Sequence, residues 1–290
     1  PARPAVIHDV EHRWALGEIQ ALHNTKRQKG YMEDVLSVYR PFFDEGVNVD
    51  VVDEEADFSR YKLVVAPMLY MLRAGIAEKL ARFVENGGVL VGTYWTGVVD
   101  ESDLCFLGGT PGQGLDGVFG LRQTEIDALY PDDKNTVRIL PDAGLHGFAP
   151  EYASGDLCQL VETTTARTLA VYGSDFYAGT PALTVNSFGN GRAYYVAARM
   201  PQSFYDDFLG MLCRELGLKN LDAALPKDVT VSMRRDEKTG REFLFVQNFS
   251  DAPAEIALPG GLTDAETGEP CTGTLCLPGY GLRILLRETR

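Results

Sequence analysis

The segment Phe83–Gly97, FVENGGVLVGTYWTG, restricts the fold of this chain more than any other segment. Its first residues end an amphipathic helix, Asn86-Gly87 supplies a left-handed helix stop, and the apolar run Val89–Gly92 predicts a short buried strand. A polar and aromatic loop follows at Thr93–Gly97. Because ligands and catalytic groups gather at the carboxyl ends of strands in an open α/β sheet, this loop is where chemistry is expected. It contains no cysteine, histidine or carboxylate.

Alternating strand and helix patterns surround this segment. Ala5–Val10 and Val47–Val52 are β-branched and apolar, and Leu63–Ala66 is fully apolar, as a buried parallel strand should be. Helical spacing of apolar residues over Tyr31–Phe43 and Ile76–Val84 predicts the intervening helices. The alternation predicts a parallel sheet with helices on both faces.

The pattern changes in the second half of the chain. Asp100–Gly117 is rich in glycine and is expected to be a flexible loop, and Gly189-Asn190-Gly191 predicts a hairpin. A last helix is expected over Phe204–Leu216, and the periodicity breaks near Leu218–Lys227. Beyond that break the period is two, which predicts a small antiparallel β-domain. We therefore expect one domain over residues 1–222 and a second over 223–290. Its strands are expected at Val229–Met233, Glu242–Gln247, Glu255–Leu258, Thr274–Leu277 and Leu282–Leu286.

Charge and cysteine content narrow the classes of partner. The formal net charge of −14 argues against nucleic acid or an anionic membrane as a partner, and no apolar run approaches membrane-spanning length. The five cysteines form no Cys-x-x-Cys motif, which favours reduced thiols in a cytoplasmic protein. A pairing of Cys271 with Cys276 across a hairpin is the alternative.

Candidate catalytic and ligand-binding motifs are weak throughout. His8, Asp9, Glu11 and His12 lie close enough in sequence to suggest a metal site, but satisfied polar groups at a strand end are the favoured interpretation. A nucleophile elbow would place a serine or cysteine where Thr93-Tyr94 stands. The glycine cluster lacks a Walker lysine, and the adjacent acidic pairs are typical of solvated surface. We expect no catalytic, cofactor-binding or metal-binding residue in these 290 residues.

Three aromatic residues remain as candidate site residues. Trp14, Tyr94 and Trp95 each follow a predicted strand, and Glu11–Trp14 is expected to be a strand-end loop. Their side chains are expected at one edge of the sheet. There they would anchor a protein interface, line the rim of a sugar pocket by stacking on the ring, or simply pack.

Long stretches of the chain resemble glycoside hydrolase family 42 β-galactosidases, in the part of those enzymes that follows the barrel. The stretches are VIHDVEHRWAL at Val6–Leu16, YKLVVAP at Tyr61–Pro67, LARFVENGGVLVGTYWTGVVD at Leu80–Asp100, GLDGVFGLR at Gly114–Arg122, FYAGTPA at Phe176–Ala182 and GNGRAYYVA at Gly189–Ala197. The tail, with EFLFVQNFSD at Glu242–Asp251 and PGYGLRIL at Pro278–Leu285, resembles the family's small C-terminal β-domain.

The resemblance implies that catalysis and subunit assembly belong to different domains. In that family an N-terminal (β/α)8 barrel carries both catalytic glutamates of a retaining mechanism. A middle domain resembling class I glutamine amidotransferases mediates trimer formation. The resemblance therefore implies a flavodoxin-like three-layer α/β sandwich followed by a small antiparallel β-sandwich, a homotrimer, and no activity without the barrel. Binding of a β-galactoside would occur only through the barrel, and no cofactor is implied. The alternatives are a stand-alone carbohydrate-binding module and a divergent amidotransferase-like enzyme.

Overall fold

The computed structural model describes residues 3–19 and 27–287, which form two compact units. The larger unit comprises Pro4–Val38 and Val51–Phe208, and the smaller unit comprises Tyr39–Asp50 and the residues from Leu209 onward. This division differs from the predicted one, because the segment Tyr39–Asp50 groups with the C-terminal residues.

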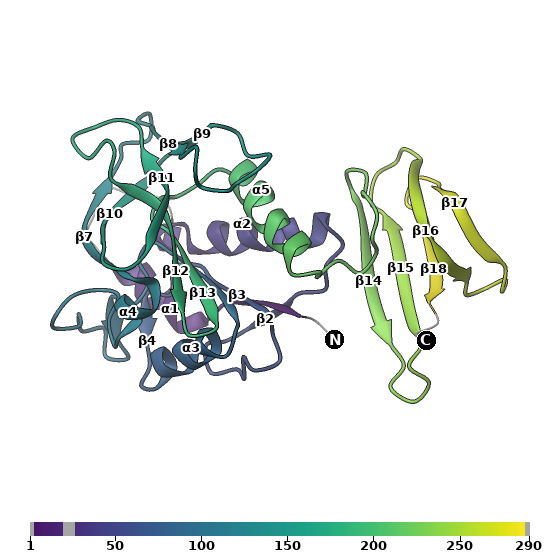
Figure 1. Ribbon diagram of the computed structural model, residues 1–290, viewed down its shortest axis with the longest axis horizontal. Helices are drawn as coiled ribbons and strands as arrows, with labels where there is room; N and C mark the ends of the chain where they lie inside the picture. Colours follow the sequence, from purple (N-terminus) through teal and green to yellow (C-terminus); the bar gives the residue numbers. More distant parts are fainter. Residues whose placement is uncertain (1–2, 20–26, 288–290) are drawn as a thin grey trace. The chain divides into compact units, whose positions relative to one another are not determined.

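A nine-stranded sheet forms the centre of the larger unit (Figure 1). Its strand order is β2-β1-β3-β5-β13-β12-β11-β8-β9. The pairs β1–β3, β3–β5 and β5–β13 are parallel, whereas β12, β11, β8 and β9 extend the sheet in antiparallel pairs. In sheet order the strands are β2 Asp50–Val52, β1 Pro4–Ile7, β3 Leu63–Ala66, β5 Val89–Thr93, β13 Gly191–Val196, β12 Pro181–Phe188, β11 Arg167–Tyr172, β8 Asn135–Ile139 and β9 Glu151–Ser154. The sheet is thus mixed, because the predicted hairpin at Gly189–Gly191 reverses the chain direction after the parallel half.

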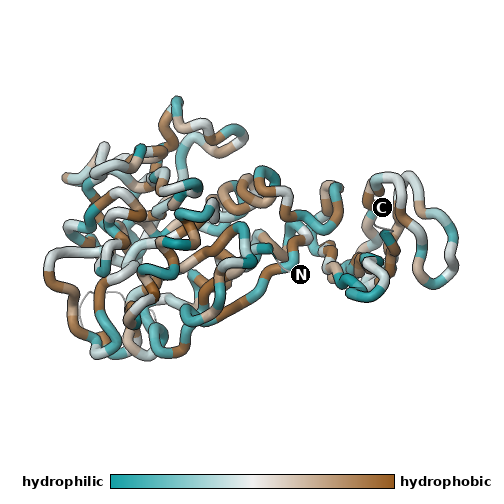
Figure 2. The backbone as a smooth tube through the Cα atoms, turned by 60° about the horizontal axis from the view of Figure 1, so that its bottom comes forward, coloured by the Kyte–Doolittle hydropathy of each residue, from teal (hydrophilic) through white to brown (hydrophobic). Residues whose placement is uncertain are grey.

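Helices cover both faces of this sheet, with α3 and α4 on one side and α2 and α5 on the other (Figure 1). The helices are α1 Val10–Glu18, α2 Tyr31–Asp44, α3 Ile76–Glu85, α4 Leu115–Phe119 and α5 Gln202–Glu215, with a 3-10 turn at Arg27–Gly30. Apolar stretches run through the enclosed strands (Figure 2). Two short strand pairs complete the unit, β4 (Met71–Leu72) with β6 (Val99–Asp100) and β7 (Leu121–Ala128) with β10 (Leu157–Thr163).

The helix α3 folds as its sequence predicts. Ile76, Leu80 and Val84 are buried in the core of the larger unit, at the spacing of one helix face. Gly87 has φ +102°, and the N–H of Gly88 donates to the carbonyl of Phe83 at 3.0 Å, which satisfies the helix end. The chain then enters β5, whose five residues are all buried.

Two local predictions differ from the structure. Glu11–Trp14 is part of helix α1 and not a strand-end loop, because the Asp9 side chain accepts a hydrogen bond from the N–H of Glu11 at 2.8 Å and caps the helix. Asp100–Gly117 is not a single flexible loop either. It begins at the end of β6 and includes the start of the short helix α4, which begins after the left-handed Gly114.

The smaller unit contains one five-stranded antiparallel sheet in the order β14-β15-β18-β16-β17. The strands are β14 Val229–Arg235, β15 Glu242–Asn248, β16 Ala254–Asp264, β17 Pro270–Leu277 and β18 Leu282–Arg287. The predicted β-sandwich is therefore a single sheet within the described residues. Its core includes Val231, Val246 and Leu285, and β16 bulges between Leu258 and Leu262, so that its second half pairs with both β17 and β18.

Cys271 and Cys276 are both free and lie on the same strand, β17, so they do not form the alternative disulfide. Within the described part of the chain, no helix is long and apolar enough to cross a membrane.

Candidate functional site at the carboxyl edge of the sheet

The ends of the parallel strands bring several polar groups together in the larger unit. The N–H of Met68, after β3, donates to Oγ1 of Thr93 at the end of β5 at 2.8 Å. The N–H of Tyr94 donates to the carbonyl of Val196, which ends β13, also at 2.8 Å. Met68 and Trp95 have φ values of +42° and +60°, and residues other than glycine seldom adopt a positive φ. Strained backbone conformations of this kind cluster at functional sites, so the carboxyl edge of this sheet is a candidate site.

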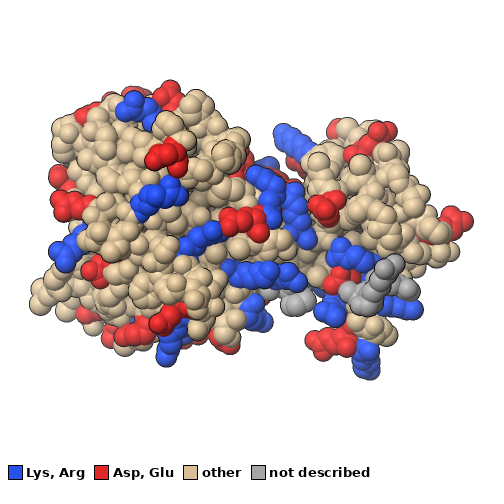
Figure 3. All heavy atoms as spheres, in the orientation of Figure 1, with Lys and Arg blue, Asp and Glu red and all other residues tan. Residues whose placement is uncertain are grey.

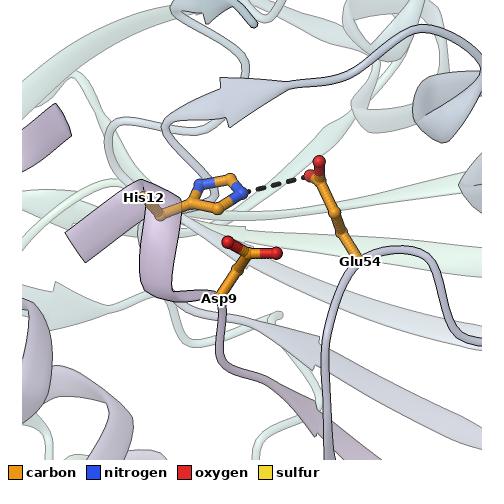
Figure 4. Close-up of side chains that lie close together, drawn as sticks. All are labelled: Asp9, His12 and Glu54. Atoms are coloured by element: carbon orange, nitrogen blue, oxygen red, sulfur yellow. Dashed lines mark hydrogen bonds and ion pairs between the residues drawn. The ribbon is translucent and has the colours of Figure 1, made fainter. Parts of the chain in front are cut away.

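A first group of charged side chains, the rim cluster, comprises Asp9, Glu11, His12, Glu54 and Arg73 (Figure 4 shows three of them). His12, on α1, accepts a hydrogen bond at Nδ1 from the N–H of Met71 at 3.2 Å. Its Nε2 lies 3.1 Å from Oε2 of Glu54. Since Nδ1 accepts, the ring proton is on Nε2 and is donated to the Glu54 carboxylate. Both ring nitrogens are therefore satisfied.

Arg73 supplies the positive charge of the rim cluster. Its Nη1 lies 3.0 Å from Oδ2 of Asp9 and 2.7 Å from Oε1 of Glu54, and its Nη2 lies 2.7 Å from Oε2 of Glu11. Burial works to raise the pKa of Asp9, but the hydrogen bonds from Arg73 and from the N–H of Glu11 outweigh it, and the pKa lies below its usual range.

The rim cluster includes three side chains with metal-ligand chemistry. Ligand atoms of Asp9, His12 and Glu54 all lie within 4.8 Å of one another. However, two of these groups already bind the Arg73 guanidinium, and the ring of the third is fixed by Met71 and Glu54. The donor set of Asp9, His12 and Glu54 fits an ion-paired cluster better than a metal centre. Of the sequence motif, His8 does not join this cluster, and its buried Nε2 has no hydrogen-bond partner among the described residues.

A second group, the buried cluster, comprises Asp34, Tyr94, Asp156 and Arg199. Arg199 follows β13, and its Nε lies 2.6 Å from the Tyr94 hydroxyl and 3.3 Å from Oδ1 of Asp34. Its Nη1 lies 3.1 Å from Oδ2 of Asp156, and the Tyr94 hydroxyl donates to Oδ2 of Asp34. Burial raises the pKa of Tyr94 well above its usual range, so the phenol keeps its proton and acts as a hydrogen-bond donor.

The electrostatics of the buried cluster favour a fixed structure. Burial alone would lower the pKa of Arg199, but Tyr94 and Asp34 raise it, so the guanidinium stays charged. At the strand end where a nucleophile elbow would carry a serine or cysteine, Oγ1 of Thr93 accepts a hydrogen bond from the N–H of Met68, and the Tyr94 phenol keeps its proton. These contacts hold the strand ends together.

The structure separates the three aromatic candidates by exposure. Trp14 is 63% exposed on α1, whereas Tyr94 is 1% and Trp95 4% exposed in the single chain. Trp95 packs against Tyr70 with ring centroids 6.2 Å apart, and its backbone N–H donates to Oε1 of Gln159 at 3.2 Å. All three follow strands of the same edge, but only Trp14 presents its ring to solvent.

Sequence reasoning missed Arg199 and Arg73, which organise the two clusters. A signal existed for Arg199, because it comes soon after the predicted strand Arg192–Ala197, at the edge where polar groups collect. No comparable signal marked Arg73, whose partners lie 19 to 64 residues away in sequence.

Comparison with known proteins places the chain in a family. The family profile described as β-galactosidase trimerisation domain matches residues 2–219, and that described as β-galactosidase C-terminal domain matches residues 228–287. The chain belongs to the β-galactosidase trimerisation-domain family. Together the two matches confirm the predicted composition, the trimerisation and C-terminal domains of a glycoside hydrolase family 42 β-galactosidase. No (β/α)8 barrel occurs within residues 3–19 and 27–287.

Similar proteins cover nearly all of this chain. β-Galactosidase Pbg of Clostridium perfringens is 44% identical over 98% of the chain, and BglY of Alicyclobacillus acidocaldarius is 42% identical over 100%. The crystal structure of the β-galactosidase from Rahnella sp. R3 has a TM-score of 0.91 and 40% identity over the whole chain. In all three cases the chain spans 41% of the similar protein's length.

Proposed function

We propose that this chain is the portion of a homotrimeric β-galactosidase that joins the subunits and carries the C-terminal domain. The match of residues 2–219 to the trimerisation domain carries this proposal. The reaction of the whole protein would be hydrolysis of terminal β-D-galactosides by a retaining mechanism. Its catalytic carboxylates would lie in a barrel outside these 290 residues, since the chain spans only 41% of its relatives.

The carboxyl edge of the sheet supports a scaffolding role. Arg73 and Arg199 each bind two or more carboxylates. Of the two histidines that follow β1, His12 has both nitrogens occupied, whereas the buried Nε2 of His8 has no hydrogen-bond partner among the described residues. Closed networks such as those of Arg73 and Arg199 fix strand ends in place. In the proposed parent protein the substrate would be bound and turned over in the barrel.

We also propose that the larger unit is related to flavodoxin-like folds and to class I glutamine amidotransferases. The order β2-β1-β3-β5-β13 supports this, because these five strands, numbered among themselves in chain order, follow the 2-1-3-4-5 order of flavodoxin. The proposed domain boundary between residues 222 and 223 lies in the interval between the two family matches.

A cytoplasmic location without nucleic-acid or membrane partners is the setting that we propose. Five free cysteines and a net charge of −14 support it.

The solution mass tests the proposal directly. A monomer has a mass of 31.8 kDa, so light scattering behind a sizing column should give about 95 kDa, three times that value. The same sample should show no turnover of a nitrophenyl β-galactoside. A mass of 31.8 kDa would contradict self-association through these residues, and measurable turnover would contradict the assignment of catalysis to another part of the protein.

A second candidate function is carbohydrate binding through the strand-end aromatics Trp14, Tyr94 and Trp95. The 63% exposure of Trp14 favours it, because an exposed indole can stack on a sugar ring. Titration of tryptophan fluorescence with galactose or lactose checks this. Saturable quenching that disappears in Trp14→Ala would support sugar binding. An unchanged spectrum would contradict sugar binding and favour a protein interface as the role of Trp14.

A further inference from the structure

The smaller unit contains a groove of about 850 Å³, lined by the segment Tyr39–Asp50 and by residues of β14 and β15. All of its lining residues belong to that unit. Pockets that bind small ligands have volumes of about 300–1,000 Å³. The groove is therefore large enough for a ligand of several rings, and it lies apart from the carboxyl edge of the larger sheet.

The floor of the groove is the face of the five-stranded sheet that points away from the core. Val229 and Val231 of β14 lie in the core, so the residues that alternate with them, Thr230 and Ser232, point to the opposite face. Gln247 of β15 pairs with Thr230 across the two strands, and all three polar residues line the groove. The floor is thus polar.

The wall formed by Tyr39–Asp50 is fixed to this sheet. Oγ1 of Thr230 donates to the carbonyl of Phe43 at 2.6 Å. The Asn48 side chain binds the carbonyl and the N–H of Met233 at 2.7 and 3.0 Å. Because these contacts form without a ligand, the groove is preorganised, which lowers the entropic cost of binding.

The groove offers hydrogen-bonding groups that the protein itself does not use. The hydroxyls of Tyr39 and Ser232 and the side-chain amide of Gln247 have no hydrogen-bond partner among the described residues. Each of these groups both donates and accepts, as a sugar hydroxyl does. The half-buried rings of Tyr39 and Phe43 lie beside them and suit the apolar face of a sugar ring.

Charge gives no preference for an ionic ligand. The basic residues that line the groove, Arg234 and Arg235, are balanced by the acidic residues Asp50 and Glu237. Acidic and basic side chains are also interspersed over the visible face of the smaller unit (Figure 3). A phosphate or a polyanion would need an excess of positive charge, so the lining favours a neutral ligand.

The strand edge beside the groove is closed to an extended peptide. The carbonyl of Val231 accepts from Nδ2 of Asn220 at 2.8 Å, and both backbone groups of Met233 are bound by Asn48. A peptide that adds a strand to a sheet needs these edge groups free. Recognition in the groove therefore depends on its side chains.

We propose that this groove binds a neutral oligosaccharide. A sugar ring packs against Tyr39 and Phe43, and its hydroxyls exchange hydrogen bonds with Ser232 and Gln247. This site is separate from the strand-end aromatics Trp14, Tyr94 and Trp95, which belong to the larger unit.

Calorimetric titration of the chain with neutral and anionic oligosaccharides tests the proposal. Both tryptophans lie in the larger unit, so tryptophan fluorescence does not report on the groove. The probes are β-1,4-galactotetraose and cellotetraose, which are neutral, and tetragalacturonate, which is anionic. At least one neutral probe should give a saturable heat of binding, and tetragalacturonate should give none.

Substitutions in the groove locate the binding. The double variant Ser232→Ala/Gln247→Ala should lower the affinity for the neutral probe about tenfold or more, because two hydrogen bonds are lost. Thr272→Ala, at an exposed position of β17 outside the groove, is the matched control and should bind as the unmodified chain does. Trp14→Ala should also bind unchanged. Far-UV circular dichroism of each variant checks that it folds.

Three results would overturn the proposal. The first is the absence of heat with both neutral probes, and the second is tighter binding of tetragalacturonate. The third is an unchanged affinity in the double variant, and a loss in Trp14→Ala instead would assign the sugar to the larger unit. The solution mass is an independent measurement, so a monomer that binds the sugar through this groove would contradict the trimer and leave this inference intact.

Discussion

The sheets of the two units bury their residues in different ways. In the larger unit every residue of β3, Leu63–Ala66, is buried, because helices cover both faces of the sheet. In β15 of the smaller unit burial alternates, with Leu244 and Val246 fully buried and Phe245 and Gln247 half-buried between them. One sheet therefore uses every side chain of a strand for its core, and the other uses every second one.

The same difference decides where charged groups lie. At the strand ends of the larger unit, Arg199 is 8% exposed beside Asp34, which is 5% exposed. In the smaller unit Arg283 on β18 is 44% exposed and lies 3.7 Å from Asp264. In the larger unit both members of the pair are thus enclosed, whereas in the smaller unit Asp264 is 11% exposed and its partner Arg283 lies largely in water.

The largest expected effect is the loss of the enclosed charge. Arg199→Met should lower the free energy of unfolding by about 3–5 kcal/mol, because Asp34 would remain buried, and Asp156 half-buried, without their partner. Arg283→Met, the matched change in the smaller unit, should cost at most about 1 kcal/mol, because Arg283 is largely in water and the Asp264 carboxylate keeps its hydrogen bonds from the N–H groups of Glu266 and Thr267. Urea unfolding followed by circular dichroism measures both. Equal losses would contradict the comparison.

Consecutive truncations test the burial patterns themselves. Val64→Ala and Val65→Ala, neighbours in β3, should each cost roughly 2 kcal/mol, because both side chains are fully buried. In β15, Val246→Ala should cost a similar amount, whereas Gln247→Ala should cost less than about 0.5 kcal/mol. The same unfolding experiment applies. A small loss for either β3 variant would mean that one face of the larger sheet is less well packed than its burial implies.

The outer edge of β14 gives a third, smaller effect. Asn48 binds Met233 as a neighbouring strand would, with Nδ2 donating to the carbonyl at 2.7 Å and Oδ1 accepting from the N–H at 3.0 Å. Asn48→Ala should therefore lower the free energy of unfolding by about 1–3 kcal/mol and leave an open strand edge prone to aggregation. Asn190→Ala, at an exposed turn position, is the control and should change stability by less than about 0.5 kcal/mol.

The regular parts of both sheets could be predicted from the sequence. The apolar run Leu63–Ala66, the helix with Ile76 and Leu80, and the hairpin at Gly189–Gly191 all occur as their patterns indicate. Local periodicity determines these elements because their core faces are apolar. The resemblance to glycoside hydrolase family 42 added the identity of the two domains, which periodicity alone does not give.

The predictions failed where one local signal outweighed another and where side chains interact over long sequence distances. Helix α1 depends on the Asp9 cap, a signal that was present in the sequence and outweighed by the preceding strand pattern. The partners of Arg199 lie 43, 105 and 165 residues away, and those of Asn48 about 170 to 185 residues away, so no local pattern contains them. Trp95 is buried in a left-handed backbone conformation, and no sequence pattern predicts that conformation at a tryptophan.

The pH dependence of stability gives the smallest expected effect and tests the rim cluster. The pKa of Asp9 in the folded chain lies below the usual value of 3.8, so its ionised form stabilises the fold above pH 3.8, and this contribution is lost as the pH falls through the folded pKa. Asp9→Asn should therefore be less stable than the unmodified chain at pH 7, and the difference should shrink below pH 3.8. Glu33→Gln, at an exposed position of α2, should show no such convergence. Thermal unfolding between pH 3 and 7 measures the stability difference between the unmodified chain and Asp9→Asn. If that difference stays constant down to pH 3, Arg73 does not bind the Asp9 carboxylate preferentially in its ionised form.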